Sequence, residues 1–227
     1  MNLVFVHGAG GTSKVWQYQK RYFSTTYEVT ALTLSGHGKA NGEGCNTIDA
    51  YMEEVRQNIP YADTVLVGHS MGGGITMKYA LTFPLKACVL VGTGAKLRVL
   101  PAILEQITVD YEKTVDLILE YAIYNKTESI MRHSKEEFLI TPPEVTYNDF
   151  LACDHFNVME EIERLRIPAL IICGAQDMLT PPKYSEYLAA KIKTSCIHII
   201  PECGHMVMLE KPEEFNRILE QFLRDLE

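Results

Sequence analysis

The stretch that decides the fold of this chain is 64–74, which reads TVLVGHSMGGG. Its first residues, Thr64–Val67, form a short apolar run of the kind that makes a buried strand. The glycines that follow permit a sharp turn, and the next residues favour a helix that starts at Ser70 and stops near Pro84. This order of strand, turn and helix predicts an α/β fold.

Further apolar runs alternate with helical stretches along the chain, which is typical of a parallel sheet covered by helices on both faces. One helix is expected after Ser13, through Trp16 and Tyr22, and Pro212 opens a last amphipathic helix, Glu213–Leu226. The other predicted strands are Leu3–Val6, Tyr27–Leu34, Ala87–Val91, Ala169–Cys173 and Cys196–Ile200. We therefore predict a doubly wound, mostly parallel sheet of about six strands.

A long interval without a convincing strand separates the runs that end at Val91 and begin at Ala169. It is too long for a plain crossover. Two of its segments, Tyr111–Tyr124 and Pro143–Phe156, have the periodicity of short amphipathic helices. The predicted division is a core of residues 1–96 and 166–227 with an inserted helical cap of residues 97–165.

The cap is rich in aromatic and aliphatic residues, which suggests an apolar pocket for an acyl or alcohol group. Such residues at helical spacing more often form the core of the cap itself, and we do not assign them as substrate contacts. They are Tyr111, Leu117, Tyr121, Tyr124, Phe138 and Phe150.

Composition and charge exclude several classes of protein. Hydrophobic residues make up 47% and charged residues 22%, which is ordinary for a globular chain. The formal net charge of −8 argues against a nucleic acid partner. The apolar run at the N-terminus is too short for a signal peptide or a membrane span, so we expect a cytoplasmic protein. The six cysteines form no CxxC pair, which indicates free thiols rather than a zinc site or a disulfide framework. Composition does not indicate an oligomeric state.

Ser70 is the predicted nucleophile. The pattern G-x-S-x-G at 68–72 stands between a strand and a helix, as a nucleophile elbow requires. The alternative is that Ser70 only caps the helix.

A second glycine-rich loop, His7-Gly8-Ala9-Gly10-Gly11, follows the first strand and can approach an acyl oxygen. We predict the backbone N–H groups of Ala9 and Met71 as an oxyanion hole. The alternative, a phosphate-binding loop, lacks both G-x-G-x-x-G and G-K-[ST].

His205 and Asp177 are the predicted partners of the serine. His205 follows the last strand and Asp177 follows the strand before it, at the sheet edge where open α/β sheets bind ligands. The chain order Ser, Asp, His is the order this fold predicts. Alternatively, Asp177 only caps the turn before Thr180. Of the other histidines, His69 is expected to pack beside the elbow and His198 to be structural, whereas the roles of His133 and His155 in the cap stay open.

With these motifs the chain resembles the α/β-hydrolase superfamily over essentially its whole length. The resemblance implies an eight-stranded core with a lid, a mechanism without cofactor or metal, and small-molecule ester-type substrates. It assigns the same five residues: Ser70, Asp177, His205, Ala9 and Met71. Because the chain begins at what would be the third strand of the family, it is similar to the compact plant methylesterase and hydroxynitrile lyase branch. The motifs are HGAGG, GHSMGG, SGHG at Ser35–Gly38, LIICGAQD at Leu170–Asp177 and ECGHMVMLEKPEEF at Glu202–Phe215.

The predicted function is a serine hydrolase that cleaves a small-to-medium carboxylic ester, thioester or lactone through an acyl-enzyme on Ser70. Four alternatives remain: a C–C bond hydrolase, a lyase, a perhydrolase on the same triad, and a ligand-binding receptor without catalysis. Met206 disfavours the lyase, because the hydroxynitrile lyases of this family carry a lysine beside the base histidine.

Overall fold

A computed structural model describes residues 1–59 and 63–227. In this part of the chain, six strands pair in parallel to form one sheet with the order β2-β1-β3-β4-β5-β6. The predicted doubly wound parallel sheet is therefore confirmed. The strands are β1 (Asn2–Val6), β2 (Glu28–Leu32), β3 (Thr64–His69), β4 (Ala87–Val91), β5 (Ala169–Gly174) and β6 (Ser195–Ile200).

The central strands β3, β4 and β5 are buried along their whole length, because helices cover both faces of the sheet. The edge strand β6 alternates between partly buried and exposed residues. His198 lies in β6, as the sequence predicts, but its side chain is exposed and takes no part in the core.

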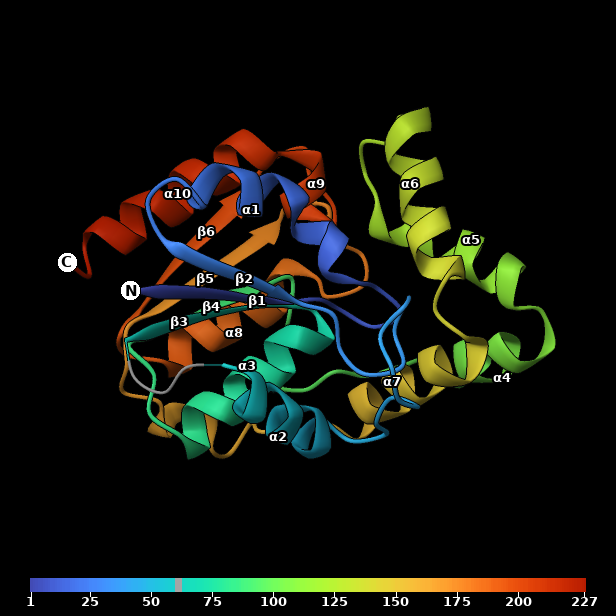
Figure 1. Cartoon of the computed structure of the whole chain (residues 1–227), viewed down its shortest axis with the longest axis horizontal. Coiled ribbons are helices and arrows are strands. Elements are labelled where there is room, and N and C mark those ends of the chain that lie inside the picture. The colour runs from blue at the N-terminus through green and yellow to red at the C-terminus, as the bar shows by residue number, and fades with distance from the viewer. Residues whose placement is uncertain (60–62) are drawn as a thin grey trace.

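Helices pack on the two faces of the sheet in two separate layers of core (Figure 1). A short 3-10 helix (Ser13–Trp16), α1 (Gln17–Phe23), α9 (Val207–Glu210) and α10 (Pro212–Arg224) cover one face. The other face is covered by α2 (Ile48–Asn58), α3 (Met71–Thr82) and α8 (Pro182–Lys191). Within the described residues, no helix has the length and hydropathy needed to cross a membrane.

The interval between β4 and β5 contains four α-helices, which lie beyond the carboxyl ends of the strands (Figure 1), and a short 3-10 helix, Ile162–Arg164, which precedes β5. Two of them match the predicted helical segments closely. A small separate core of Val115, Leu119, Ala122 and Ile123 holds part of this region together. The four are α4 (Pro101–Val109), α5 (Tyr111–Ala122), α6 (Glu128–Leu139) and α7 (Pro143–His155).

Candidate active site

Ser70 lies at the turn between β3 and α3 in a strained backbone conformation, with φ 53° and ψ −115°. A positive φ at a residue other than glycine costs about 1–3 kcal/mol and is concentrated at functional sites. The turn is also very tight: a Cβ atom on Gly68 would lie 2.0 Å from the carbonyl oxygen of Gly72. Ser70 occupies the N-cap position of α3, but its side chain makes no capping hydrogen bond.

His205 is held by Asp177, as the sequence predicts. Its Nδ1 lies 2.8 Å from Oδ2 of Asp177, and both side chains are almost fully buried. Because a carboxylate only accepts hydrogen bonds, Nδ1 is the donor, and Nε2 of the neutral ring is left as the acceptor. Nε2 has no hydrogen-bond partner among the described residues, and His205 lines the same cavity as Ser70.

Asp177 also organises its own loop. Its Oδ1 accepts the N–H groups of Leu179 (2.9 Å) and Thr180 (2.8 Å), while the Thr180 hydroxyl donates to Oδ2 (2.9 Å). Burial alone would raise the pKa of Asp177, but the charge and hydrogen bonds of His205 and Thr180 lower it below its ordinary value. The turn-capping role and the contact with His205 therefore coexist in one carboxylate.

His69 packs against His205, with the ring centroids 4.6 Å apart. Its Nε2 donates to the backbone carbonyl of His205 at 3.1 Å. Burial and the nearby His205 lower the pKa of His69 well below its ordinary value, so its ring is neutral. As expected, His69 lies beside the elbow, where it supports the position of His205.

The glycine-rich loop after β1 lies directly against the elbow. A Cβ atom on Gly8 would be 3.1 Å from Cβ of Ser70, and both Gly8 and Ala9 line the cavity. Within residues 1–59 and 63–227, neither the Ala9 nor the Met71 N–H group has a hydrogen-bond partner. Ala9 lines the cavity beside Ser70, and Met71 directly follows Ser70 as the first residue of α3.

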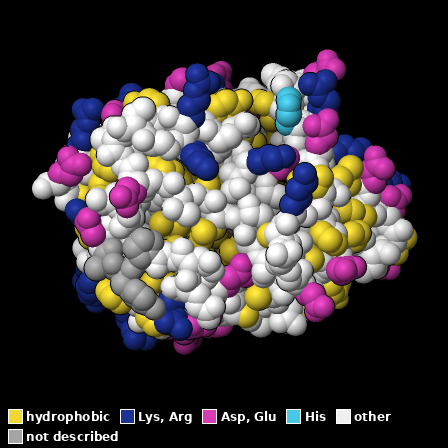
Figure 2. Space-filling view, in the orientation of Figure 1, with side chains coloured by type: hydrophobic (Ala, Val, Ile, Leu, Met, Phe, Trp, Pro, Cys, Tyr) yellow, Lys and Arg dark blue, Asp and Glu magenta, His cyan; other side chains and the backbone are white. Residues whose placement is uncertain are grey.

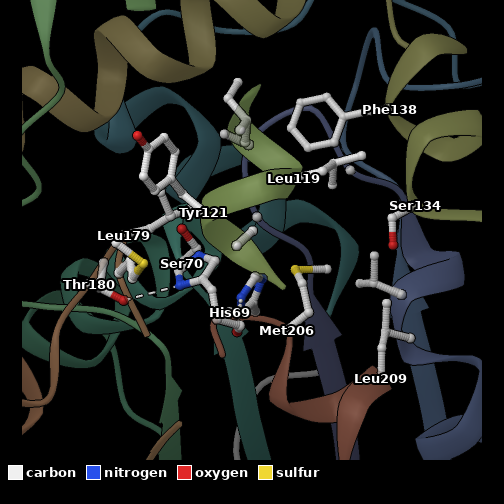
Figure 3. Close-up of a pocket in the computed structure, with 18 of the residues that line it drawn as sticks. His69, Ser70, Leu119, Tyr121, Ser134, Phe138, Leu179, Thr180, Met206 and Leu209 are labelled. Carbon is white, nitrogen blue, oxygen red and sulfur yellow. Dashed lines mark hydrogen bonds between the residues drawn. The ribbon is translucent and has the colours of Figure 1, made fainter. Parts of the chain in front are cut away.

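Ser70 opens into a cavity of about 970 Å³ lined mainly by apolar side chains. In Figure 3, Ser70 lies between Tyr121 and Leu179 on one side and Met206 and Phe138 on the other. Hydrophobic side chains also reach the surface between the sheet and α6, with Lys and Arg side chains nearby (Figure 2).

The six aromatic and aliphatic residues that the sequence singles out in the cap take different positions in the structure. Leu117, Tyr121, Phe138 and Phe150 line the cavity. The Tyr111 hydroxyl instead contacts the backbone carbonyl oxygens of Phe138 and Thr141 and the Thr146 hydroxyl. The side chain of Tyr124 is exposed, and those of Leu117 and Tyr121 are exposed in part although they line the cavity, so helical periodicity alone does not predict which residues form a core.

The structure adds one residue that the sequence interpretation missed. The hydroxyl of Thr180 contacts both members of the Asp177–His205 pair, at 2.9 Å from Oδ2 of Asp177 and 3.2 Å from Nδ1 of His205. The available signal was its position three residues after Asp177 in a turn, where a hydroxyl can return to the carboxylate.

Comparisons with known proteins agree with this geometry. The chain matches the alpha/beta hydrolase family over residues 3–218. It is similar to a thermophilic esterase of known structure, with a TM-score of 0.86 and 36% identity over 99% of this chain and 90% of that one. It is 26% identical to the 2-hydroxy-6-oxononadienedioate/2-hydroxy-6-oxononatrienedioate hydrolase of Burkholderia vietnamiensis, over 98% of this chain and 86% of the relative. It is 25% identical to the pimeloyl-(acyl-carrier protein) methyl ester esterase of Aliivibrio fischeri, over 98% of this chain and 93% of the relative. The chain therefore belongs to the alpha/beta hydrolase family, and it is a hydrolase that resembles carboxylesterases.

Proposed function

We propose that the protein is a serine hydrolase that cleaves a small-to-medium carboxylic ester through an acyl-enzyme on Ser70. One observation carries the proposal: a serine at a strained elbow, a histidine paired with a buried aspartate, and the glycine-rich loop with the free Ala9 N–H group all meet at a single apolar cavity. Acyl transfer needs a nucleophile, a base with an orienting acid, and donors for the oxyanion.

In this mechanism each group has one task. His205 takes the proton of Ser70 through its free Nε2 as the serine oxygen attacks the ester carbonyl. Asp177 stabilises the imidazolium that results. The Ala9 and Met71 N–H groups bind the oxyanion, each contributing about 3 kcal/mol to the transition state. After the alcohol leaves, water attacks the acyl-enzyme with His205 again as base, so the cycle needs no cofactor.

The cavity supports an ester with apolar groups, because its lining offers mostly aliphatic and aromatic contacts. The named activities of similar proteins include an esterase at 36% identity and a methyl ester esterase, which support ester chemistry, while the hydrolase of Burkholderia vietnamiensis keeps C–C bond hydrolysis as the second candidate. We further propose that residues 97–165 act as the cap over this cavity. The six unpaired cysteines support a reducing compartment such as the cytosol.

Steady-state hydrolysis of p-nitrophenyl acetate, butyrate, octanoate and palmitate by the wild type and by Ser70→Ala tests the proposal. We expect turnover by the wild type and none above background by the variant, with circular dichroism confirming that both are folded. The exposed Ser24→Ala is the matched control and keeps full activity, since Ser24 bonds only to the Lys20 carbonyl beside it.

A pH series adds a second criterion. Activity falls as the pH is lowered, because a histidine base that has already taken up a proton no longer accepts one from Ser70. A folded wild type that cleaves none of the four esters, or a Ser70→Ala variant that keeps its activity, contradicts the proposal.

A further inference from the structure

A second buried His–Asp pair joins the cap to the glycine-rich loop. Asp149 belongs to α7, and its Oδ2 accepts the Gly10 N–H at 2.8 Å and lies 2.7 Å from Nε2 of His37. Its Oδ1 accepts the Tyr51 hydroxyl at 2.6 Å. The side chains of Asp149 and His37 are fully buried. Figure 1 shows α7 beside the loops that follow β1 and β2.

The hydrogen bonds around this pair indicate its charge state. Nδ1 of His37 faces the Ser35 carbonyl at 3.0 Å and Nε2 faces Asp149, so both ring nitrogens donate. Burial alone would lower the pKa of His37, but the hydrogen bond and charge of Asp149, with the Ser35 carbonyl, raise it above its ordinary value. The pair is an imidazolium and a carboxylate enclosed in the protein.

His7 holds the neighbouring part of the loop in a different way. Its Nε2 accepts the Leu34 N–H at 3.0 Å, so Nδ1 carries the proton and donates to the Gly8 carbonyl at 2.8 Å. Burial and the adjacent positive charge of His37 lower the pKa of His7 to about 3, which keeps this ring neutral. The Gly8 carbonyl also accepts the Gly11 N–H at 3.2 Å.

These contacts fix the peptide groups on both sides of Ala9. The Gly8 carbonyl and the Ala9 N–H belong to one planar peptide group, so anchoring the carbonyl sets the direction of the N–H. The Ala9 carbonyl and the Gly10 N–H form the next peptide group, which Asp149 holds. His7 therefore holds one side of Ala9, and a carboxylate from the cap holds the other.

We propose that Asp149 is a positioning residue for the oxyanion hole, which aims the Ala9 N–H at the reacting oxygen by holding Gly10. The inference rests on the proposed function, since Ala9 acts as a donor there. A carboxylate suits this position, because its two oxygens accept from Gly10, His37 and Tyr51 at once. A buried ion pair is weak evidence for a gain in stability. The hydrogen bond from Gly10 instead links the Asp149–His37 pair to the peptide groups on either side of Ala9.

The test compares two variants that each remove a hydrogen bond of the same carboxylate. Asp149→Asn weakens the hold on Gly10, while Tyr51→Phe removes the Tyr51 hydroxyl and leaves the Gly10 contact in place. For a p-nitrophenyl ester, we expect kcat of Asp149→Asn to fall about 10- to 100-fold with KM within about twofold. The loss of a whole oxyanion donor costs about 100- to 1000-fold. Tyr51→Phe keeps kcat within about twofold.

An alkyl boronic acid supplies a further readout, since it forms a tetrahedral adduct on serine whose oxygen occupies the oxyanion hole. Its inhibition constant rises in Asp149→Asn about as much as kcat falls, and stays unchanged in Tyr51→Phe. The inference is overturned if kcat and boronic acid binding weaken equally in both variants, in proportion to the stability that each variant has lost. An unchanged kcat in Asp149→Asn also overturns it.

Hydrogen–deuterium exchange separates this inference from the proposed function. The Gly10 amide of the wild type is protected, and in Asp149→Asn it exchanges faster while in Tyr51→Phe it does not. This readout needs no substrate, so a wild type without esterase activity contradicts the proposed function alone. If Asp149→Asn does not fold, hydrogen–deuterium exchange at Gly10 of the wild type still tests the inference. A Gly10 amide that exchanges as fast as an exposed turn amide overturns the inference.

Discussion

The molecule contains two buried His–Asp pairs whose histidines have different surroundings. The Asp177–His205 pair has a separation of 2.8 Å and the Asp149–His37 pair one of 2.7 Å. They differ at the other nitrogen of the ring. In His205 this nitrogen has no partner in the described residues, whereas in His37 it donates to the Ser35 carbonyl. A histidine can act as a base only where one nitrogen is left to accept a proton.

The two carboxylates also share a pattern of donors. Each accepts a side-chain hydroxyl, from Thr180 in one pair and from Tyr51 in the other. Each also accepts backbone N–H groups, but Asp177 holds its own loop while Asp149 holds Gly10 of a distant one. In the proposed mechanism the first pair takes part in proton transfer, whereas the second connects α7 to the glycine-rich loop after β1.

Replacing each histidine in turn with glutamine is expected to give the largest difference in kcat between the two pairs. His205→Gln lowers kcat by about 10⁶-fold, because loss of the base disables the whole catalytic unit. His37→Gln leaves kcat within about 100-fold, because its ring takes no proton from the substrate. Steady-state kinetics with a p-nitrophenyl ester measures both. Similar losses in the two variants would contradict the division of roles.

Replacing each aspartate in turn with asparagine is expected to give the second largest difference in kcat. Asp177→Asn lowers kcat about 10⁴-fold, because an amide favours the wrong tautomer of His205. Asp149→Asn loses only about 10- to 100-fold, since it displaces a donor without removing the base. The comparison requires both variants to be folded at the assay temperature, which a thermal melt checks. A loss in Asp149→Asn as large as that in Asp177→Asn contradicts the positioning role.

The sequence predicts the first pair and not the second, for a physical reason. Asp177 and His205 each follow a strand of one parallel sheet, so the fold alone brings both to the same edge. Asp149 and His37 are 112 residues apart, and no local pattern joins them. In the sequence, His37 belongs to the motif SGHG, and Asp149 is one polar residue within the predicted helix Pro143–Phe156. Neither position indicates that the two side chains meet.

The predictions of secondary structure also succeeded where the signal is local in the sequence. All six strands could be predicted because buried parallel strands are nearly continuous apolar runs. Helix α2 was missed, since its exposed face is charged and its start depends on a single cap, in which Thr47 accepts the Ala50 N–H. The distribution of the cap side chains between cavity and core depends on packing, which periodicity does not encode.

The two pairs stabilise the protein in opposite pH ranges. The pKa of Asp177 is lowered in the folded state, so its contribution is present above about pH 4 and is lost as the pH falls through the folded pKa. The pKa of His37 is raised, so its contribution is full below about pH 6.5 and is lost as the pH rises through the folded pKa. The groups facing His37 are Asp149, Tyr51 and His7.

Urea unfolding across the pH range checks these signs. We expect the free energy of unfolding to decline as the pH drops below about 6.5, because the buried His7 and His69 stay neutral in the folded chain and take up protons when it unfolds. The loss of the Asp177 contribution steepens this decline at lower pH, and the loss of the His37 contribution produces a separate decline at alkaline pH. His37→Gln removes part of the alkaline decline, and Asp177→Asn part of the acid decline. An alkaline decline that is unchanged in His37→Gln contradicts a charged His37 in the folded protein.

The smallest predicted effect concerns the two hydroxyls. Thr180→Val and Tyr51→Phe keep the shape of the side chain and remove one hydrogen bond to a carboxylate, at a cost of about 1–3 kcal/mol in unfolding. Only Thr180 also contacts His205. Its loss therefore lowers kcat by about tenfold or less, through a less firmly oriented base, whereas Tyr51→Phe changes stability alone. Equal kcat values in the two variants show that Thr180 contributes to the fold of its loop and not to the orientation of His205.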